Sequence, residues 1–169
     1  FILPRESGSG RELVYLCGHS LGAQPVLAAE YVEEVMRDWR SLGVDGHFAA
    51  RHAWTRYHER AAPALANLVG AEPAEVVAMN TLTVNLHLML VGFYRPAGER
   101  TALLVERQAF PSDRHAAESQ VRFHGLDPAR DLIEVEPRAG EDCLRTEDVI
   151  AVVAREGPRI ATVLLAGGG

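Results

Sequence analysis

Three short segments contain side chains whose types and spacing could do chemistry. The first, Gly18-His19-Ser20-Leu21-Gly22, fits the Gly-x-Ser-x-Gly nucleophile elbow, in which a serine occupies a tight turn between a strand and a helix. By itself it would indicate an α/β-hydrolase with Ser20 as the nucleophile. Only 17 residues precede the motif, too few for the strands and oxyanion loop that come earlier in that fold, and Pro25 falls within the first turns of the expected helix. An esterase therefore stays the less favoured alternative.

The second segment, Asn80-Thr81-Leu82-Thr83-Val84-Asn85-Leu86, is predicted to join a short strand to the start of a helix. The free N–H groups and the positive dipole end of such a helix can bind an anion such as phosphate, and the Thr83 hydroxyl could add a hydrogen bond. Ordinary capping of the helix explains the same residues, so both interpretations stay open.

The third segment, Gln108-Ala109-Phe110-Pro111-Ser112-Asp113, follows another predicted strand, at the edge where open α/β sheets bind ligands. An aromatic side chain there could stack on a flat ring. Residues 111–113 are equally typical of a plain helix start, so this segment alone does not decide between a ligand site and a structural turn.

Composition argues against several other classes of function. The net charge is −6 and the arginines are scattered, whereas a nucleic-acid-binding protein needs a clustered basic face. The seven histidines show no His-Glu-x-x-His pattern, and Cys17 and Cys143 lack Cys-x-x-Cys spacing, so neither a metal site nor a disulfide framework is expected. All 17 basic residues other than histidine are arginine, so the chain offers no lysine amine for covalent catalysis.

The elements that must position these segments follow from hydrophobic periodicity and turn residues. Short apolar runs predict strands at residues 13–17, 76–79, 102–105, 132–135 and 160–165. Helical spacing predicts helices at residues 26–40, 84–91 and 112–123, a helix kinked or restarted at Pro63 that stops at Gly70, and one capped by Thr146 that runs to about residue 155. Residues 41–54 are expected to be a loop. This alternation predicts an α/β domain with a mostly parallel sheet covered on both faces.

The two ends of the sequence carry further expectations. Residues 1–5 lack the layout of a signal peptide and no run approaches a membrane span, which is typical of a cytoplasmic protein. The sequence ends at Ala166-Gly167-Gly168-Gly169, directly after a predicted apolar strand, where a further element would be expected to cover the sheet edge. We interpret this ending as a truncation.

Taken together and in this order, the segments resemble kynureninases over essentially the whole chain. The matching stretches are Tyr15-Leu16-Cys17-Gly18-His19-Ser20-Leu21-Gly22-Ala23-Gln24-Pro25, Gly46-His47 with Trp54 after it, Met79-Asn80-Thr81-Leu82-Thr83-Val84-Asn85-Leu86-His87-Leu88, Ala109-Phe110-Pro111-Ser112-Asp113, and Glu118-Ser119-Gln120 followed by His124-Gly125-Leu126. A hydrolase elbow accounts for the first stretch alone, so the resemblance outweighs it.

The resemblance implies part of a homodimeric pyridoxal-phosphate (PLP) enzyme of fold-type I, with active sites at the subunit interface. Residues 55–169 would form the first, incomplete part of the large PLP-binding domain, residues 25–54 a connecting helix and loop, and residues 1–24 a segment on the side of the small domain. The implied reaction is the hydrolysis of L-kynurenine or 3-hydroxykynurenine to L-alanine and anthranilate or 3-hydroxyanthranilate, in tryptophan catabolism and NAD biosynthesis.

The same resemblance gives roles to individual residues. The backbone around Leu82 and Thr83 would hold the cofactor phosphate, and Phe110 would stack on the pyridine ring. The residues that would line the same pocket are Pro111, Ser112 and Asp113. The lysine that forms the Schiff base, the aspartate that faces the pyridinium nitrogen and a phosphate-binding tyrosine lie, in the family, beyond the last residue of this chain.

On the substrate side, Ser20 and His47 match positions that contact substrate, so Ser20 would bind and not act as a nucleophile. Two departures from the family stand nearby: His19 replaces an asparagine in the turn, and Ala166 replaces a cofactor-proximal serine. Two hypotheses follow. Either a longer product or a second polypeptide supplies the lysine-bearing part, or the chain is a non-catalytic pairing or regulatory module.

Overall fold

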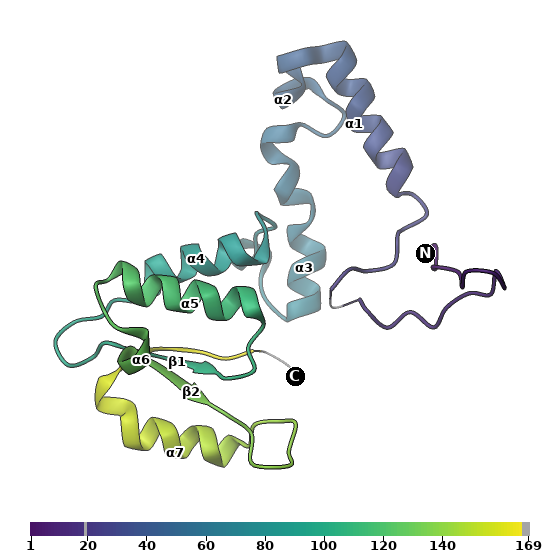
Figure 1. Ribbon diagram of the computed structural model, residues 1–169. Helices are drawn as coiled ribbons and strands as arrows, with labels where there is room; N and C mark the ends of the chain where they lie inside the picture. The colour runs from purple at the N-terminus through teal and green to yellow at the C-terminus, as the bar shows by residue number, and fades with distance from the viewer. Residues whose placement is uncertain (19, 167–169) are drawn as a thin grey trace. The chain divides into compact units, whose positions relative to one another are not determined.

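The computed structural model describes residues 1–18 and 20–166, and the chain divides into two compact units, Phe1–Ala78 and Met79–Gly169 (Figure 1). Ser20 and His47 belong to the first unit, whereas every residue predicted to bind the cofactor belongs to the second. In the described part of the chain, no helix is long and apolar enough to cross a membrane.

The first unit is built mostly from helices. It contains α1 (Ala28–Leu42), α2 (Gly46–Ala49) and α3 (Ala62–Val69), with 3₁₀ helices at Gly43–Asp45, Trp54–Arg60 and Pro73–Glu75. The predicted helix at residues 26–40 and the stop at Gly70 are confirmed. Gly70 has a φ of 70°, a left-handed conformation that glycine adopts without strain at a helix end. Pro63 stands in the first turn of α3, so it begins this helix instead of kinking a longer one.

Three predictions for the N-terminal half are wrong. Residues 13–17 and 76–79 form no strand, and isolated bridges instead pair Ile2 with Gln24 and Arg5 with Glu12. Residues 41–54, predicted to be a loop, contain α2 and a 3₁₀ turn. The physical reason is that an apolar run becomes a strand only where a neighbouring strand takes up its N–H and C=O groups, and composition does not reveal that neighbour.

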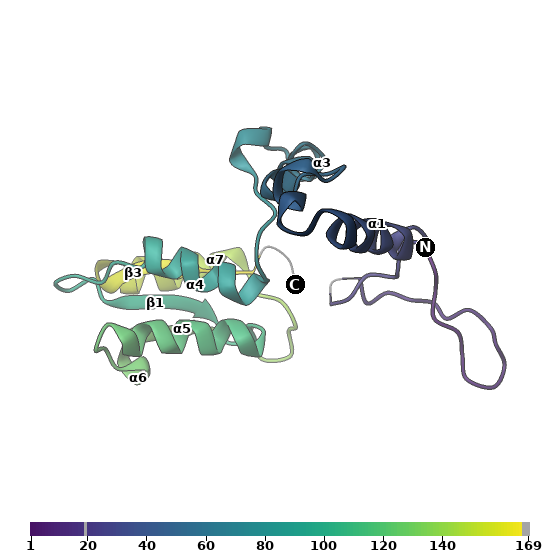
Figure 2. The ribbon, with the colours of Figure 1, turned by 90° about the horizontal axis from the view of Figure 1, so that it is seen from above.

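The second unit is a three-stranded parallel sheet with helices on both faces (Figures 1 and 2). Its elements in chain order are α4 (Leu82–Phe93), β1 (Ala102–Glu106), α5 (Pro111–Phe123), α6 (Pro128–Asp131), β2 (Leu132–Val135), α7 (Thr146–Glu156), a 3₁₀ helix (Gly157–Arg159) and β3 (Ile160–Leu164). The strand order is β2-β1-β3, so β1 is the central strand. Helices α4 and α5 cover one face and α7 the other, which confirms the predicted α/β layering.

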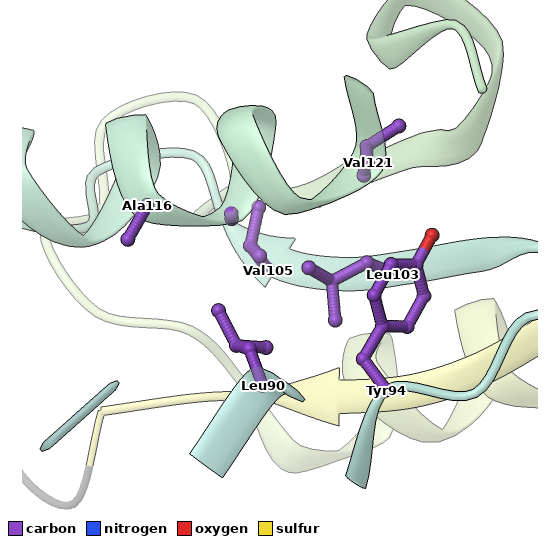
Figure 3. Packing of buried hydrophobic residues seen from close by; sticks show 7 residues of the cluster. Leu90, Tyr94, Leu103, Val105, Ala116 and Val121 are labelled. Carbon is purple, nitrogen blue, oxygen red and sulfur yellow. The ribbon is translucent and has the colours of Figure 1, made fainter. Parts of the chain in front are cut away.

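The core of the second unit lies between β1 and the helix pair α4 and α5 (Figure 3). The side chains of Leu103 and Val105 point from β1 towards this pair, and small residues on α5 let that helix pack closely. The buried cluster consists of Leu90, Tyr94, Leu103, Val105, Ala116, Ala117 and Val121. Residues 102–105 of β1 are all buried, as expected of a central parallel strand covered on both faces.

One capping prediction in this unit is wrong. Thr146 is the first helical residue of α7, and the capping position is Arg145, which makes no side-chain capping hydrogen bond. The helix starts one residue earlier than a threonine cap would place it. The other predicted helices and strands of this unit match the structure to within two residues at each end, which is the usual uncertainty of element boundaries.

Candidate functional site

The carboxyl ends of the three parallel strands share one edge of the sheet, where Glu106 of β1 pairs with Val135 of β2 and Val105 pairs with Leu164 of β3. A hollow of about 330 Å³ opens at this edge, beside the ends of β1 and β3. Its lining residues are Val105, Glu106, Gln108, Ala109, Phe110, Asp113, Arg114, Leu164, Leu165 and Ala166. This is the edge where open α/β sheets bind ligands.

Phe110 lies where the chain leaves β1 and enters α5. The N–H of Ala109 donates to the carbonyl of Glu106 (3.2 Å), which forms the turn, and Pro111 is the first helical residue. The Phe110 side chain is 70% exposed in this chain, so its ring is held by the turn and not by packing. An exposed ring at the mouth of a hollow is able to stack on a flat ligand.

Ser112 and Asp113 form the first turn of α5 behind Phe110. The Ser112 hydroxyl donates to the Asp113 carboxylate (3.1 Å), and the N–H of Asp113 donates to the carbonyl of Phe110 (2.9 Å). Asp113 lines the hollow, whereas Pro111 and Ser112 are not among its lining residues. The structure therefore brings Phe110, Asp113 and Ala166 of the predicted cofactor set together at one hollow.

The start of α4 has the features of an anion site. Asn80 has a φ of 49°, a left-handed conformation, and its amide donates to the Asn85 side chain (3.1 Å), which in turn donates to the carbonyl of Met79 (2.8 Å). This network turns the chain sharply into the helix. The Thr81 hydroxyl caps α4 by accepting from the N–H of Val84 (3.4 Å). The N–H groups of the first helical residues, Leu82 and Thr83, have no partner within the helix.

Helices α4 and α5 run in the same direction, so both begin at the carboxyl edge of the sheet. The Nε2 of Gln120 lies 3.1 Å from Nδ1 of His87, and the ring of Tyr94 packs edge-on against His124 with 5.3 Å between the centroids. The first contact joins the middle of α4 to the last turn of α5, and the second joins the residues that follow the two C-terminal ends. Both views show the starts of the two helices on the same side (Figures 1 and 2). Thr83 and Phe110 therefore stand at one edge, although Leu82 and Thr83 do not line the hollow itself.

Electrostatically, the hollow is not an obvious cationic site. Arg114 lines it, but its guanidinium donates to Glu134 (2.9 Å) and to Glu118 (2.5 Å). The hydrogen bond to Glu134 and the negative charges of Glu118 and Glu134 raise the pKa of Arg114 above its ordinary value. Because the positive charge of Arg114 is already balanced by these two glutamates, a phosphate would be bound more readily by backbone N–H groups and hydroxyls than by this arginine.

Ser20 lies in a tight turn of the first unit, where its N–H donates to the carbonyl of Cys17 (3.0 Å). No strand precedes this turn among residues 13–17, and the next helix starts only at Ala28. A nucleophile elbow needs both neighbours, so the structure removes the context on which the esterase alternative depends. His19 lies outside the described residues.

His47 stands on α2 and is fixed by the residues after it. Its ring meets the Trp54 indole edge-on at 5.4 Å between centroids, and the Thr55 hydroxyl donates to its carbonyl (2.9 Å). Gly46 permits this packing, because a Cβ at that position would lie 2.5 Å from the Trp54 ring. The sequence therefore needs glycine immediately before His47 to let the indole set the orientation of that histidine.

No protein-family model matches the chain, but comparison with curated proteins gives a consistent result. The chain is 52% identical over 166 residues to a kynureninase of Koribacter versatilis and 54% identical over 156 residues to one of Myxococcus xanthus. A kynureninase of Christiangramia forsetii is 49% identical over 167 residues. The alignments cover 98%, 92% and 99% of this chain.

The chain matches one part of a kynureninase. It spans 39%, 37% and 39% of the lengths of those three relatives.

Sequence reasoning gave no individual role to Glu106 or Gln108, which both line the hollow at the carboxyl edge. A second hollow of about 260 Å³ shares both residues and Ala166 with the first, and reaches Asp142 and Cys143 on the other side. The signal that was available is a charged residue at the carboxyl end of an otherwise buried strand. Among the described residues, no group of three or more histidine, cysteine, aspartate and glutamate side chains could hold a metal ion.

Proposed function

We propose that the chain is the part of a PLP-dependent kynureninase that holds the cofactor phosphate and the face of its ring. The complete enzyme would hydrolyse L-kynurenine or 3-hydroxykynurenine to L-alanine and the corresponding anthranilate. The observation that carries the proposal is the common edge of the parallel sheet at which α4 and α5 both begin, with Thr83 at one helix start and Phe110 at the other.

The donor set at α4 is suited to a phosphate group. The N–H groups of Leu82 and Thr83 lie at the positive end of the helix dipole, and the Thr83 hydroxyl adds a third donor. The Thr81 hydroxyl is already engaged with Val84, so it would hold the helix start in shape without binding the ligand itself. This arrangement supports the proposed role of Leu82 and Thr83.

The ring of the cofactor would lie against Phe110. Its exposed face allows offset stacking, and the Asp113 carboxylate in the same hollow could accept a hydrogen bond from a bound ligand. When bound, PLP supplies the electron sink that stabilises negative charge next to the cleaved bond. The residues of this chain would orient the ring and exclude water from one of its faces.

The substrate would be contacted by Ser20 and His47, the positions that match the family. His47 is held by Trp54, so its ring could be presented in a fixed direction for a hydrogen bond. Because the 169 residues contain no lysine, the amine that holds the cofactor covalently in this family must come from a residue outside them.

We also propose the fold-type I assignment of residues 55–169, the small-domain side for residues 1–24 and assembly as a homodimer in the cytoplasm. The composition of the surface supports the need for further contacts. None of the residues of α1 is buried, and Val32 and Trp39 on this helix are 63% and 60% exposed. Val32 and Trp39 stand seven residues apart and so share one face of the helix, which supports a contact of that face with other protein.

The test is cofactor binding and product formation by the complete gene product that contains this chain. We expect it to bind PLP with a visible absorbance band that survives dialysis, and to release anthranilate and L-alanine in equal amounts from L-kynurenine. A Ser20→Ala variant should keep the band and raise KM for kynurenine. A complete protein that neither binds PLP nor cleaves kynurenine would overturn the proposal, and loss of the band in Ser20→Ala would overturn the substrate role of Ser20.

A further inference from the structure

The carboxylate of Glu106 makes a hydrogen bond that spans 60 residues of sequence. Its Oε1 accepts from the N–H of Ala166 at 2.8 Å. Glu106 is the last residue of β1, and Ala166 follows the end of β3. The bond therefore joins the two neighbouring strands at the edge where the candidate site lies.

The hydrogen bond between Glu106 and Ala166 lies just beyond the last backbone pair of β1 and β3. The last paired residues of β1 and β3 are Val105 and Leu164, so the N–H of Ala166 has no opposite carbonyl within that ladder. The carboxylate of Glu106 fills that place.

Two backbone hydrogen bonds hold the chain in place at Glu106. The N–H of Arg107 donates to the carbonyl of Val135 in β2 (2.8 Å), and the N–H of Ala109 donates to the carbonyl of Glu106 (3.2 Å). The first bond ties the end of β1 to β2 and the second forms the turn that leads to Phe110. The side chain then ties the same point to β3, so all three strands meet at Glu106.

The bond also lies at the boundary of the two hollows. Glu106, Gln108 and Ala166 line both the hollow next to Phe110 and the hollow next to Cys143. Because Ala166 lines both hollows, a shift of Ala166 away from β1 would change the shape of the hollow next to Phe110. The position of Ala166 therefore decides how well a flat ring fits against Phe110.

We propose that Glu106 is a positioning residue for the cofactor, acting through the backbone of Ala166 and not by contact with the reacting atoms. This inference rests on the proposed PLP function. It assigns the acceptor oxygen of Glu106, and not its negative charge, as the feature the site requires, because the bond to an N–H needs only a well-placed oxygen.

The test compares three variants of Glu106 in the complete gene product, with PLP affinity measured by absorbance titration and the setting of the bound ring by visible circular dichroism. Glu106→Ala removes the acceptor and should weaken PLP binding about tenfold, the equivalent of about one hydrogen bond. Glu106→Gln keeps an oxygen at the same reach and should stay within about twofold of the wild type. Glu106→Asp keeps the charge on a shorter side chain and should bind PLP more weakly than Glu106→Gln.

The matched control is Glu136→Ala. Glu136 follows the end of β2 at the same edge, but its carboxylate pairs with the exposed Arg107 and lines neither hollow. This variant should bind PLP like the wild type. Far-ultraviolet circular dichroism shows whether each variant is folded. If Glu106→Ala does not fold, a higher PLP affinity of Glu106→Gln than of Glu106→Asp still tests the positioning role.

The outcomes separate this inference from the proposed function. A wild-type protein that binds PLP, with Glu106→Asp equal to or better than Glu106→Gln, would overturn the positioning role and leave the proposed function intact. Equal PLP affinities of the wild type and all three Glu106 variants would also overturn the positioning role and leave the proposed function intact. A wild-type protein that does not bind PLP would overturn both.

Discussion

The amide Nε2 of Gln120 lies 3.1 Å from Nδ1 of His87, and this contact joins the two helices that begin at the candidate site. Gln120 is only 8% exposed, and its Oε1 has no hydrogen-bond partner in the described part of the chain. The pair therefore holds α4 against α5 through one polar contact beside an apolar core. If this contact is lost, the unpaired buried amide of Gln120 should destabilise the fold more than the missing contact itself does.

The first prediction concerns this pair. His87→Leu should lower the free energy of unfolding by about 1–3 kcal/mol, because it leaves the whole Gln120 amide buried without a partner. Gln120→Met removes the buried amide and should change that free energy by less than about 1 kcal/mol. Chemical denaturation of both single variants and the double variant checks this. A double variant as unstable as His87→Leu alone would contradict the explanation.

The second prediction concerns the buried Asp131 at the opposite edge of the sheet. Its carboxylate accepts from the Thr101 hydroxyl (2.6 Å), from Arg130 (2.8 Å) and from the N–H of Asp127 (3.3 Å). Burial opposes the charged form, but the hydrogen bonds from Arg130, Thr101 and Asp127 outweigh it and lower the pKa of Asp131 below its ordinary value. Asp131→Ala should cost about 1–3 kcal/mol of stability at neutral pH.

The pH dependence of that cost follows from the direction of the shift. A carboxyl group whose pKa is lower in the folded state contributes stability above its unfolded pKa of about 3.9, and loses it as pH falls through the folded-state value. The difference in unfolding free energy between wild type and Asp131→Ala should therefore be constant near neutral pH and shrink below about pH 4. A difference that grows on acidification would contradict the lowered pKa of Asp131.

The same buried carboxylate acts on Tyr94, because burial and the negative charge of Asp131 raise the pKa of Tyr94 to about 12.

The third prediction tests stacking at the start of α5. Phe110→Ala should weaken PLP binding by about tenfold in the complete gene product, the equivalent of about 1–1.5 kcal/mol for an aromatic contact. Stability should change little, because the ring is 70% exposed. Phe123→Ala is the matched control, because Phe123 is 78% exposed at the other end of the same helix. If both variants bind PLP like the wild type, the stacking role is wrong.

The fourth prediction tests the packing that orients His47. Gly46→Ala would place a Cβ 2.5 Å from the Trp54 indole, so this variant should lose about 1–3 kcal/mol of stability and raise KM for kynurenine. Gly92→Ala is the control, because a Cβ at Gly92 in α4 would meet no atom within 4 Å. That change should stabilise the helix by about 0.5–1 kcal/mol. Equal behaviour of the two variants in a thermal unfolding experiment would contradict the account.

The second unit was predictable because its strands are apolar runs, buried in β1 and mostly half-buried in β2 and β3, and its helices alternate with them in a regular order. The apolar run of β1 lies under helices on both faces, and such runs are what periodicity detects. Residues 13–17 have the same apolar character, yet Val14 is 88% exposed and no strand pairs with this segment. Whether a neighbour exists is a property of the fold, so local sequence cannot supply it.

The candidate site was predictable to a similar degree and for a similar reason. Thr83 and Phe110 could be singled out because each stands at the start of a helix, and polar or proline-containing helix starts are a local pattern that sequence displays. Glu106 was missed because its role depends on Ala166, 60 residues further along the chain. The parallel alignment of α4 and α5 was equally invisible, because it rests on side-chain contacts such as Tyr94 with His124.

The most direct test of the central claim is the release of anthranilate, followed by its fluorescence, when the complete gene product is mixed with L-kynurenine in the presence and absence of PLP. The account predicts release that requires PLP and that falls in Phe110→Ala but not in Phe123→Ala. Cofactor-saturated, folded protein that releases no anthranilate from L-kynurenine, and none of its hydroxylated counterpart from 3-hydroxykynurenine, would contradict it.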